Sequence, residues 1–325
     1  MSASEFTDST VLITGATGSL GKKFIERALN ELGLSSIVVY SRDELKQSEL
    51  REHFGRDPRL RWVIGDIRDR DRLLKAMHGV DFVVHAAALK QVDTAEMNAY
   101  EYIHTNVIGS QNVIDAAVAA GVRKVVALST DKASSPVNLY GASKLCADKL
   151  FTSANLDPRN CGTRLCVVRY GNVLGSRGSA VPLFRRLAAK GKSLPITDKR
   201  MTRFWITLDQ AVDFIIDSFT LMKGSELFVP RIPSMRVLDL AEAVAPGALT
   251  HEVGMRPGEK LHEEMISTAD AARTYQHGDR YIVLPQRGVT DEDLPTSGRL
   301  PDGFCYRSDT NNQWLSAEDI RNILT

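Results

Sequence analysis

The sequence contains no long apolar run and little cysteine. No stretch approaches the roughly 20 apolar residues that a membrane-spanning helix needs, and the first residues lack the basic and apolar regions of a signal peptide. The cysteines show neither C-x-x-C spacing nor a histidine at metal-ligand intervals. We therefore expect a cytoplasmic protein without a metal or a membrane segment. Its cysteines, mostly in apolar surroundings, are expected to be reduced core residues: Cys146, Cys161, Cys166 and Cys305.

An excess of either charge is also absent. The chain has 41 Lys and Arg residues against 40 Asp and Glu residues, which gives a net charge of +1. No long-range field therefore favours nucleic acid or an anionic membrane as a partner, and any bound anion must be held by local groups. With 325 residues, of which 43% are hydrophobic, the chain can bury one large core or two coupled cores.

Short β-branched segments alternate with helical patterns over the first two-thirds of the chain, which is typical of βαβ units around a parallel sheet. Beyond Gly171 the pattern changes to loops rich in Gly, Ser and Arg and to short strands with prolines. We predict an α/β fold with a Rossmann-type doubly wound parallel sheet over residues 1–172 and part of 205–233 packed on it. A smaller α/β substrate-binding cap, partly interleaved, is expected over 173–325. The six predicted strands are Thr10–Thr14, Ser36–Tyr40, Leu60–Ile64, Phe82–His85, Lys124–Ser129 and Leu165–Arg169.

A G-x-x-G-x-x-G turn follows the first predicted strand and opens a helix. Apolar residues then recur at every fourth position, from Leu20 to Leu32, as on one face of an amphipathic helix. Glycines let the backbone approach a pyrophosphate, and the helix N-terminus offers N–H groups and partial positive charge. The turn is a weak signal alone, but the order of strand, turn and helix favours a dinucleotide. The residues that we assign to this site are Gly15, Thr17, Gly18, Ser19, Leu20 and Gly21.

The residues after the second strand bear on which dinucleotide binds. Ser41 and Arg42 stand where an NAD-binding protein usually presents a carboxylate to the ribose 2′-hydroxyl. They favour the 2′-phosphate of NADP, with Lys46 as a second cation. Two alternatives stay open. A register shift of one residue would make Asp43 a ribose ligand for NAD, or Arg42 and Lys46 are only solvated charges.

Further residues are assigned to the cofactor by their place after later strands. Asp66 and Ile67 follow the third strand and suit the adenine end, although an Asp in this place is often a helix N-cap. The small side chains of 86–88 follow the fourth strand and suit a flat ring, although they also permit close packing. The assigned residues are Asp66, Ile67, Ala86, Ala87, Ala88, Lys90, Thr105 and Val173.

A possible catalytic group lies at the end of the fifth strand and in the helix after it. Open α/β sheets place ligands at the strand C-termini, here Thr130, Asp131 and Lys132. Tyr140 and Lys144 share a helix face. Two unit charges ~4 Å apart interact by about 4 kcal/mol at an effective dielectric of ~20, or roughly three pKa units. We therefore expect Lys144 to lower the pKa of Tyr140 towards neutrality and to make the phenol a usable base.

Together these motifs resemble the extended short-chain dehydrogenase/reductase family, whose members commonly act on nucleotide sugars. A closer resemblance is to the inverting UDP-N-acetylglucosamine 4,6-dehydratases of pseudaminic acid biosynthesis. The stretches that carry it extend over nearly the whole chain, at 40–49, 85–90, 128–133, 138–144, 169–179, 200–206, 256–263 and 311–315. Only 267–306 lacks a recognisable motif.

The resemblance implies an NADP-dependent hydro-lyase that inverts C5 and forms UDP-2-acetamido-2,6-dideoxy-β-L-arabino-hexos-4-ulose. Thr130 binds the substrate hydroxyl, and Tyr140 and Lys144, which also contact the cofactor, assist hydride transfer. Asp131 protonates the departing C6 hydroxyl and Lys132 removes the C5 proton. A lysine is a base only if its pKa is lowered. The simpler alternative is that Asp131 and Lys132 only pair with each other.

UDP-N-acetylglucosamine, the implied substrate, requires cations, amides and a ribose acceptor. By the resemblance, Arg203 and Arg256 bind the phosphates and Glu259 binds a ribose hydroxyl, while Asn172 contacts the sugar or diphosphate and Lys90 lies near both ligands. A surface salt bridge is the alternative for either arginine. The resemblance also implies a homo-oligomer, either a dimer or a hexamer. Another NADP-dependent sugar-nucleotide epimerase, dehydratase or reductase and a non-catalytic NADP-binding sensor stay open as functions.

Overall fold

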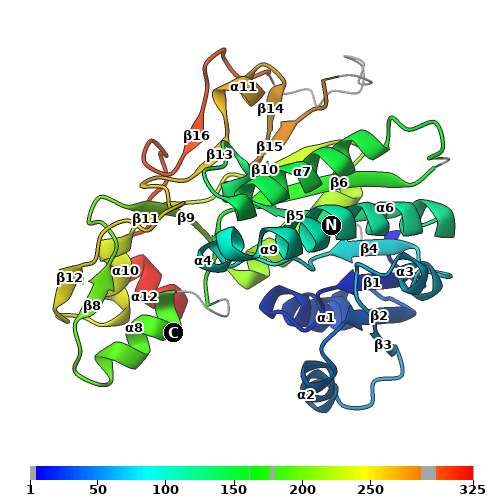
Figure 1. Cartoon of the computed structure of the whole chain (residues 1–325), viewed down its shortest axis with the longest axis horizontal. Helices are drawn as coiled ribbons and strands as arrows, with labels where there is room; N and C mark the ends of the chain where they lie inside the picture. Colours follow the sequence, from blue (N-terminus) through cyan, green and yellow to red (C-terminus); the bar gives the residue numbers. More distant parts are fainter. Residues whose placement is uncertain (1–4, 161, 176–179, 287–297, 325) are drawn as a thin grey trace.

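A mostly parallel sheet forms the centre of the molecule (Figure 1). The computed structural model describes residues 5–160, 162–175, 180–286 and 298–324. The sheet strands are β1 (Thr10–Thr14), β2 (Ser36–Ser41), β3 (Leu60–Ile64), β4 (Phe82–His85), β5 (Lys124–Thr130), β6 (Arg164–Tyr170), β10 (Leu227–Pro230), β14 (Thr274–His277) and β15 (Arg280–Val283). Their order is β14-β15-β10-β6-β5-β4-β1-β2-β3. The Rossmann-type fold class predicted from the sequence is confirmed, and each predicted strand matches within one residue at either end.

Helices cover both faces of this sheet, and the central strands are therefore apolar on both sides. Val11, Leu12 and Ile13 of β1 have no exposed surface, and the same holds for Val38 and Val39 of β2. Two helices, α1 (Ser19–Glu31) and α9 (Leu208–Leu221), pack together on one face. The other face carries α3 (Arg70–Ala76), α6 (Gly109–Ala120) and α7 (Leu139–Ala154) (Figure 1). The remaining helical segments before β5 are α2 (Glu44–Phe54), α4 (Val92–Ala95), η2 (Glu96–Asn98), α5 (Ala99–Tyr102) and the π-helix η3 (Ile103–Ile108).

The start of helix α7 packs directly against the end of strand β5. Asn138 caps the helix by accepting a hydrogen bond from the Gly141 N–H at 2.7 Å. A Cβ atom at Gly141 would lie 2.2 Å from the carbonyl oxygen of Lys132, so no larger residue fits there without movement. This contact fixes Tyr140 and Lys144 relative to the short 3-10 segment η4 (Asp131–Ala133).

A second, smaller core lies to one side of the sheet, on the left in Figure 1. Its apolar residues include Val181, Phe184, Leu240 and Ile320. Three short strands form one sheet of this region, β7 (Asn172–Val173), β9 (Thr202–Ile206) and β11 (Ser234–Arg236). A second pair is β8 (Leu194–Ile196) with β12 (Thr250–Glu252), and the helices are α8 (Ala180–Ala188), α10 (Val237–Val244) and α12 (Ala317–Leu324).

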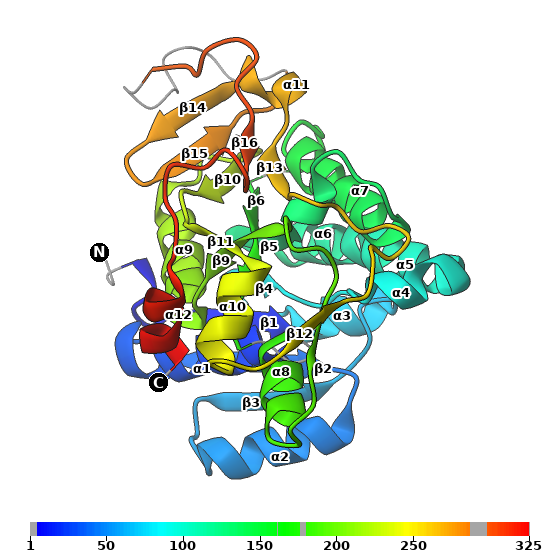
Figure 2. The same ribbon diagram turned by 90° about the vertical axis from the view of Figure 1, so that its left-hand side faces the viewer.

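The C-terminal third also contributes to the main sheet, which the sequence patterns did not indicate. Strands β14 and β15 form an antiparallel pair that extends the sheet beyond β10 (Figure 2). Leu227 of β10 pairs with Val283 of β15, so that the edge of β10 is covered. Beside this pair lie α11 (Thr268–Ala271) and the two-stranded ladder of β13 (Glu264–Ile266) and β16 (Tyr306–Arg307).

The cysteines differ from the expectation of core residues. Cys166 is buried in the main core, but Cys146 is exposed. Cys305 is half-buried, and its thiol donates a hydrogen bond to Glu264. Cys146 lies on the outer side of helix α7, where the sequence alone does not separate a buried from an exposed small residue. Cys161 lies outside the described residues. Over the described ranges, no helix has the length and apolar character that crossing a bilayer requires.

Candidate active site

A cleft of about 750 Å³ lies along the C-terminal ends of the central strands. Every residue that the sequence assigned to the cofactor lines it, from Gly15 in the first turn to Val173 in β7. Three residues that were assigned to the substrate also line the cleft, namely Lys90, Thr130 and Asn172. The catalytic residues in its lining are Thr130, Lys132, Tyr140 and Lys144. Four other assigned residues are not in its lining, namely Asp131, Arg203, Arg256 and Glu259.

The glycine turn brings the backbone to the floor of the cleft. Gly15 has a φ of +67°, and a Cβ there would lie 2.8 Å from the Ala87 nitrogen, so only glycine fits. The Ala87 N–H donates to Thr14 Oγ1 at 3.2 Å, which ties the ends of β1 and β4 together. Helix α1 begins immediately after Gly18, and no side chain caps its N-terminus. Its partial positive charge is therefore available to an anion in the cleft.

The buried hydroxyl of Thr105 supports a polar ligand in the same cleft. Thr105 lies in the π-helix η3, a distortion that is frequent at functional sites. Its Oγ1 atom is buried and has no hydrogen-bond partner in the described chain, yet the residue lines the cleft. A buried hydroxyl without a partner costs free energy unless a ligand satisfies it. The tight turn at Gly15 and this hydroxyl together fit a dinucleotide.

Three side chains near the end of β2 bear on the two alternatives that the sequence left open for the dinucleotide. Asp43 caps helix α2 and is engaged there, accepting from the Lys46 N–H at 3.0 Å and from Lys46 Nζ at 2.6 Å. Arg42 is 55% exposed in its side chain, and its Nη1 lies 3.8 Å from Asp66 Oδ2. Asp66 does not cap the next helix, because Asp69 does. Arg42 and Lys46 both line the cleft at this end, and Lys46 is paired with Asp43.

His85 lies beneath the cleft and is held neutral. Its Nδ1 is 2.8 Å from Thr14 Oγ1, its Nε2 is 3.3 Å from Ser110 Oγ, and the ring is 1% exposed. Burial, with a smaller contribution from the Lys144 charge, lowers the pKa of His85 to about 3. An imidazolium at this position would have no water and would face a lysine.

This depressed pKa predicts a pH-dependent stability. Between pH 6.5 and about 3 the unfolded chain binds a proton at His85 that the folded chain does not bind. The free energy of unfolding should therefore fall with decreasing pH through this window, by about 1.4 kcal/mol per pH unit from this residue. Chemical denaturation at a series of pH values should show this slope reduced in His85→Asn. The exposed His78→Asn serves as the control, and equal slopes in all three proteins would contradict the prediction.

The residues at the end of β5 form a connected cluster of charges. Thr130 Oγ1 donates to Asp131 Oδ1 at 2.9 Å, and Lys132 Nζ lies 3.1 Å from the same oxygen. The Thr130 hydroxyl also lies close enough to the Tyr140 phenol to favour its ionised form. Lys132 Nζ lies 3.0 Å from Oε1 of a further carboxylate, Glu263. The pairing of Asp131 with Lys132, one of the readings left open by the sequence, is thus present, but it is part of a larger arrangement.

Burial and charge act in opposite directions in this cluster. Burial raises the pKa of Asp131, and Lys132 does not fully compensate, so the carboxyl retains a proton more readily than usual. Burial alone would lower the pKa of Lys132, but the two carboxylates outweigh it and raise that pKa above its ordinary value. Asp131 is suited to donate a proton. Lys132 is held as an ammonium, so the condition that the sequence argument set for a lysine base is not met by this cluster alone.

The expected lowering of the Tyr140 pKa is wrong. Burial raises the pKa of Tyr140 to about 12, although Lys132 and the Thr130 hydroxyl act in the opposite direction. Lys144 is itself buried, which lowers its own pKa. The sequence argument considered only the attraction between two charges. Tyr140 is 9% exposed, so the loss of water around the phenol disfavours its ionised form.

Comparison with known proteins places this site in a family. Residues 11–285 match the family described as polysaccharide biosynthesis protein. The chain belongs to this family. A Campylobacter jejuni protein named UDP-N-acetylglucosamine 4,6-dehydratase (inverting) is 49% identical over 328 residues, which cover 98% of each chain. The solved structure of Pen from Bacillus thuringiensis superposes with a TM-score of 0.90, at 38% identity and 98% coverage of both chains.

A solved structure that is less similar to this chain contains a bound cofactor. DesIV from Streptomyces venezuelae, a dTDP-glucose 4,6-dehydratase, was solved with NAD and TYD. It is 27% identical, with a TM-score of 0.69, and the match covers 78% of this chain and 86% of DesIV. The shared part supports a nicotinamide dinucleotide in the fold without deciding between NAD and NADP.

Glu263 is the residue of the site that the sequence analysis missed. It is 2% exposed, and besides Lys132 it faces Arg203, whose Nε lies 3.6 Å from Glu263 Oε1. A signal was available, because Met265, two residues later along an extended segment, is apolar and fully buried. Alternate residues of a strand share a face, so Glu263 also points inward.

The residues assigned to the diphosphate and ribose have partners within the chain. Arg203 is buried, and its guanidinium donates to the carbonyl oxygens of Lys260 at 3.0 Å and of Leu261 at 3.1 Å. Arg256 is 54% exposed in its side chain and lies 3.1 Å from Asp93, while Glu259 accepts from the Arg256 N–H at 3.0 Å. Arg203 therefore organises the turn at 256–262, and Arg256 lies at its exposed tip.

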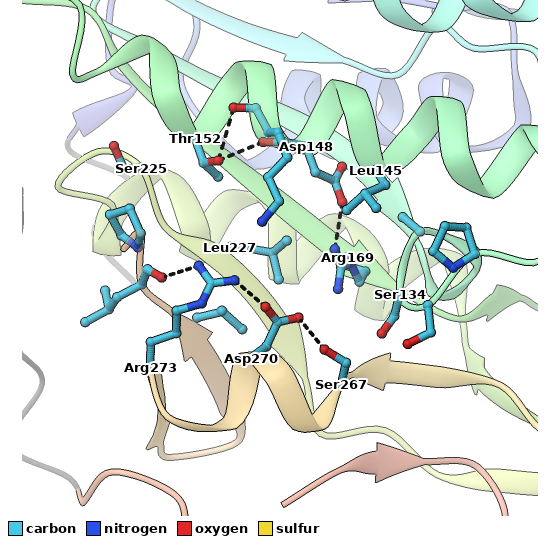
Figure 3. Close-up of a pocket in the computed structure, with 17 residues that line it drawn as sticks. Ser134, Leu145, Asp148, Thr152, Arg169, Ser225, Leu227, Ser267, Asp270 and Arg273 are labelled. Atoms are coloured by element: carbon cyan, nitrogen blue, oxygen red, sulfur yellow. Dashed lines mark hydrogen bonds and ion pairs between the residues drawn. The ribbon is translucent and has the colours of Figure 1, made fainter. Parts of the chain in front are cut away.

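A second cavity, of about 240 Å³, lies between helix α7 and the segment that carries α11 (Figure 3). It includes none of the residues assigned to the cofactor or substrate. Figure 3 shows Asp148 of α7 facing Arg169 of β6, at 2.9 Å. Arg169 Nη1 also donates to the carbonyl oxygen of Met265 at 3.0 Å. This buried ion pair thus joins the catalytic helix to strand β13. In the described part of the chain, no group of His, Cys, Asp and Glu is arranged to hold a metal ion.

Proposed function

We propose that the protein is an inverting UDP-N-acetylglucosamine 4,6-dehydratase, a hydro-lyase that uses a nicotinamide cofactor and acts in pseudaminic acid biosynthesis. The observation that carries this proposal is the position of Asp131 and Lys132. They lie beside Tyr140 at the end of β5, and Lys132 and Tyr140 line the same cleft as the glycine turn. A plain 4-epimerase needs no proton donor at C6, so the acid and the amine favour dehydration over epimerisation.

The side chains divide the reaction into proton transfers. A nicotinamide dinucleotide held by the glycine turn at Gly15, by Tyr140 and by Lys144 would supply a hydride acceptor for C4 of the sugar and a hydride donor for C6. Tyr140 takes the C4 hydroxyl proton, with Thr130 binding the same hydroxyl. Lys132 removes the proton at C5, which the new C4 carbonyl makes acidic. Asp131 then gives a proton to the departing C6 hydroxyl, for which its raised pKa is suited.

Three residues of the cleft lining are proposed to hold the substrate, namely Lys90, Thr130 and Asn172. Arg256 and Glu259, at the exposed tip of their turn, are proposed for the diphosphate and ribose. Arg256 has the freedom for this role, because its surface pair with Asp93 contributes little and breaks easily. Arg203 stays a prediction for the phosphates, although its present contacts give it a supporting role.

We propose NADP as the cofactor, because the exposed Arg42 lines the cleft where the adenosine would lie, whereas the nearby Lys46 is paired with Asp43. Arg42→Glu should weaken NADP binding at least about tenfold while changing NAD binding little, since only NADP brings a phosphate against the new carboxylate. Isothermal calorimetry with both dinucleotides measures this difference. The exposed Arg159→Glu is the control for the charge change, and equal losses for both cofactors would place the 2′-phosphate elsewhere.

Self-assembly into a dimer or a hexamer is also proposed. Large apolar side chains are exposed along the segment 97–108, among them Met97, Tyr100, Ile103 and Ile108. A concentration of exposed large apolar side chains in one segment favours a protein contact there. Size measurement by light scattering tests the oligomeric state.

Proton NMR of the reaction with UDP-N-acetylglucosamine and NADP tests the proposed function directly. The expected product has a 6-methyl group and an inverted C5 configuration. A product epimerised at C4 with its C6 hydroxyl intact would identify an epimerase instead. Unchanged substrate would leave a non-catalytic dinucleotide-binding protein as the better interpretation.

A further inference from the structure

Glu263 lies behind Lys132 as seen from the cleft. Lys132 lines the cleft and is 23% exposed in its side chain, whereas Glu263 is buried and is not part of the lining. The Glu263 carboxylate therefore does not meet the sugar. It contacts the amine at 3.0 Å, so any influence on the reaction passes through Lys132.

An ammonium has no lone pair, so Lys132 must lose a proton before it can remove one from C5. Two carboxylates lie within reach of Nζ. Asp131 Oδ1 already accepts from Thr130 at 2.9 Å. In the proposed function Asp131 must also be protonated when the C6 hydroxyl departs, so it is not free to receive the Lys132 proton at that moment. Glu263 is the remaining acceptor.

We propose that Glu263 is a positioning residue that aims the Lys132 amine at C5 and takes up its proton before the C5 step. This inference rests on the proposed function. In the transfer an Nζ–H bond of Lys132 breaks and an Oε1–H bond of Glu263 forms, and the ion pair becomes an amine and a carboxylic acid. The amine lone pair then takes the C5 proton, and the electron pair of the C5–H bond forms the C5–C6 double bond as the C6–O bond breaks.

The charges around Glu263 fit an acceptor that starts ionised. Burial alone would raise its pKa, but Lys132, Arg203 and Lys260 outweigh burial and lower it, while Asp131 is the other carboxyl nearby. Its second oxygen, Oε2, is buried and has no partner in the described part of the chain, which penalises the charged form. When a substrate covers the partly exposed Lys132, water is removed, and the neutral pair gains relative to the ion pair.

Single-turnover kinetics of Glu263→Gln separate this role from a structural one. The amide keeps the shape and can accept a hydrogen bond, but it cannot take up the proton. We expect reduced nicotinamide to form, because C4 oxidation is intact, and to persist, because the C5 step is roughly 10²-fold slower. That step should accelerate about tenfold per pH unit, since the Lys132 proton must now leave to solvent, whereas the wild-type step should show little pH dependence in the neutral range.

Two further variants complete the experiment. Glu263→Asp retains a carboxylate and should restore most of the rate together with the wild-type pH profile. Glu226→Gln is the matched control for the loss of a buried carboxylate, because Glu226 accepts backbone N–H groups, from Lys223 at 2.7 Å and from Gly224 at 2.9 Å, and is not part of the cleft lining. It should leave the C5 step unchanged.

A Glu263→Gln enzyme that performs the C5 step at the wild-type rate or faster, with a flat pH profile, would overturn the inference. Should Glu263→Gln not fold, Glu263→Asp decides alone: most of the wild-type rate together with the wild-type pH profile supports the proton transfer, and a C5 step that accelerates about tenfold per pH unit despite the retained carboxylate overturns it. A wild-type enzyme that makes no 6-methyl product overturns the proposed function, and this inference with it. A wild-type enzyme that makes this product, combined with an unaffected Glu263→Gln variant, overturns the inference alone.

Discussion

Lys132→Met abolishes dehydration, with a loss of at least about 10²–10⁴-fold in the rate of product formation, and leaves the cofactor bound. Methionine has nearly the length of the lysine stem but no amine, so no group remains to remove the C5 proton. C4 oxidation does not require that amine. We therefore expect reduced nicotinamide to accumulate on mixing with UDP-N-acetylglucosamine, and proton NMR to show no 6-methyl product.

The controls for Lys132→Met address stability as well as chemistry. Removal of the ammonium leaves Glu263 opposite Arg203 and deprives Asp131 of one partner, so a decrease in thermal stability is expected. The melting temperature and the dissociation constant for NADP report whether the fold and the cofactor site survive. The exposed Lys190→Met should behave as wild type. Full activity in Lys132→Met would remove this residue from the mechanism.

Tyr140→Phe stops the reaction at an earlier stage. The phenylalanine ring fills the same buried space, but it cannot take the C4 hydroxyl proton, so we expect a loss on the order of 10²–10⁴-fold in C4 oxidation. In contrast to Lys132→Met, little reduced nicotinamide should form. Stopped-flow absorbance of the nicotinamide measures this difference.

Two observations would contradict the role of Tyr140. One is the formation of reduced nicotinamide at the wild-type rate in Tyr140→Phe. The other is an equal loss in Tyr275→Phe, since Tyr275 lies in strand β14, is not part of the cleft lining and serves as the matched control. Because the pKa of Tyr140 is raised to about 12, the wild-type oxidation step should also accelerate as the pH rises through the alkaline range, where more of the phenol becomes ionised.

The main sheet was readable from the sequence because its strands are buried on both faces. Uninterrupted apolar segments such as Val11–Ile13 and Val125–Val126 have few other stable environments. The last two strands were not readable for the opposite reason. β14 and β15 are short, with polar residues such as Gln276 and Arg280, and their partner β10 lies some 50 residues earlier in the chain. Nothing local in the sequence specifies that pairing.

The sequence predicts the position of a site residue where a motif fixes the backbone geometry. It does not predict the pKa or the partner of a side chain, because these depend on the surrounding fold. The turn at Gly15 and the helix register of Tyr140 and Lys144 bring these residues to one cleft. The direction of the Tyr140 pKa depends on burial, and the partner of Lys132 comes from a segment more than 100 residues away. The spacing of residues along the chain indicates neither the burial of Tyr140 nor the partner of Lys132. Arg203 shows the same limit, since a cation suited to phosphate turned out to hold backbone carbonyls.

The buried Arg169 links two parts of the chain that have different tasks. Through Asp148 it holds the helix of Tyr140, and through the Met265 carbonyl it holds the segment that carries Glu263. Exchange of the C-terminal third with that of a relative that acts on another sugar would thus replace the neighbour of Lys132 along with the sugar contacts. On the proposed roles of these residues, a chimera designed to change the sugar preference must therefore retain Glu263 together with the Arg169 contacts to Asp148 and to the Met265 carbonyl.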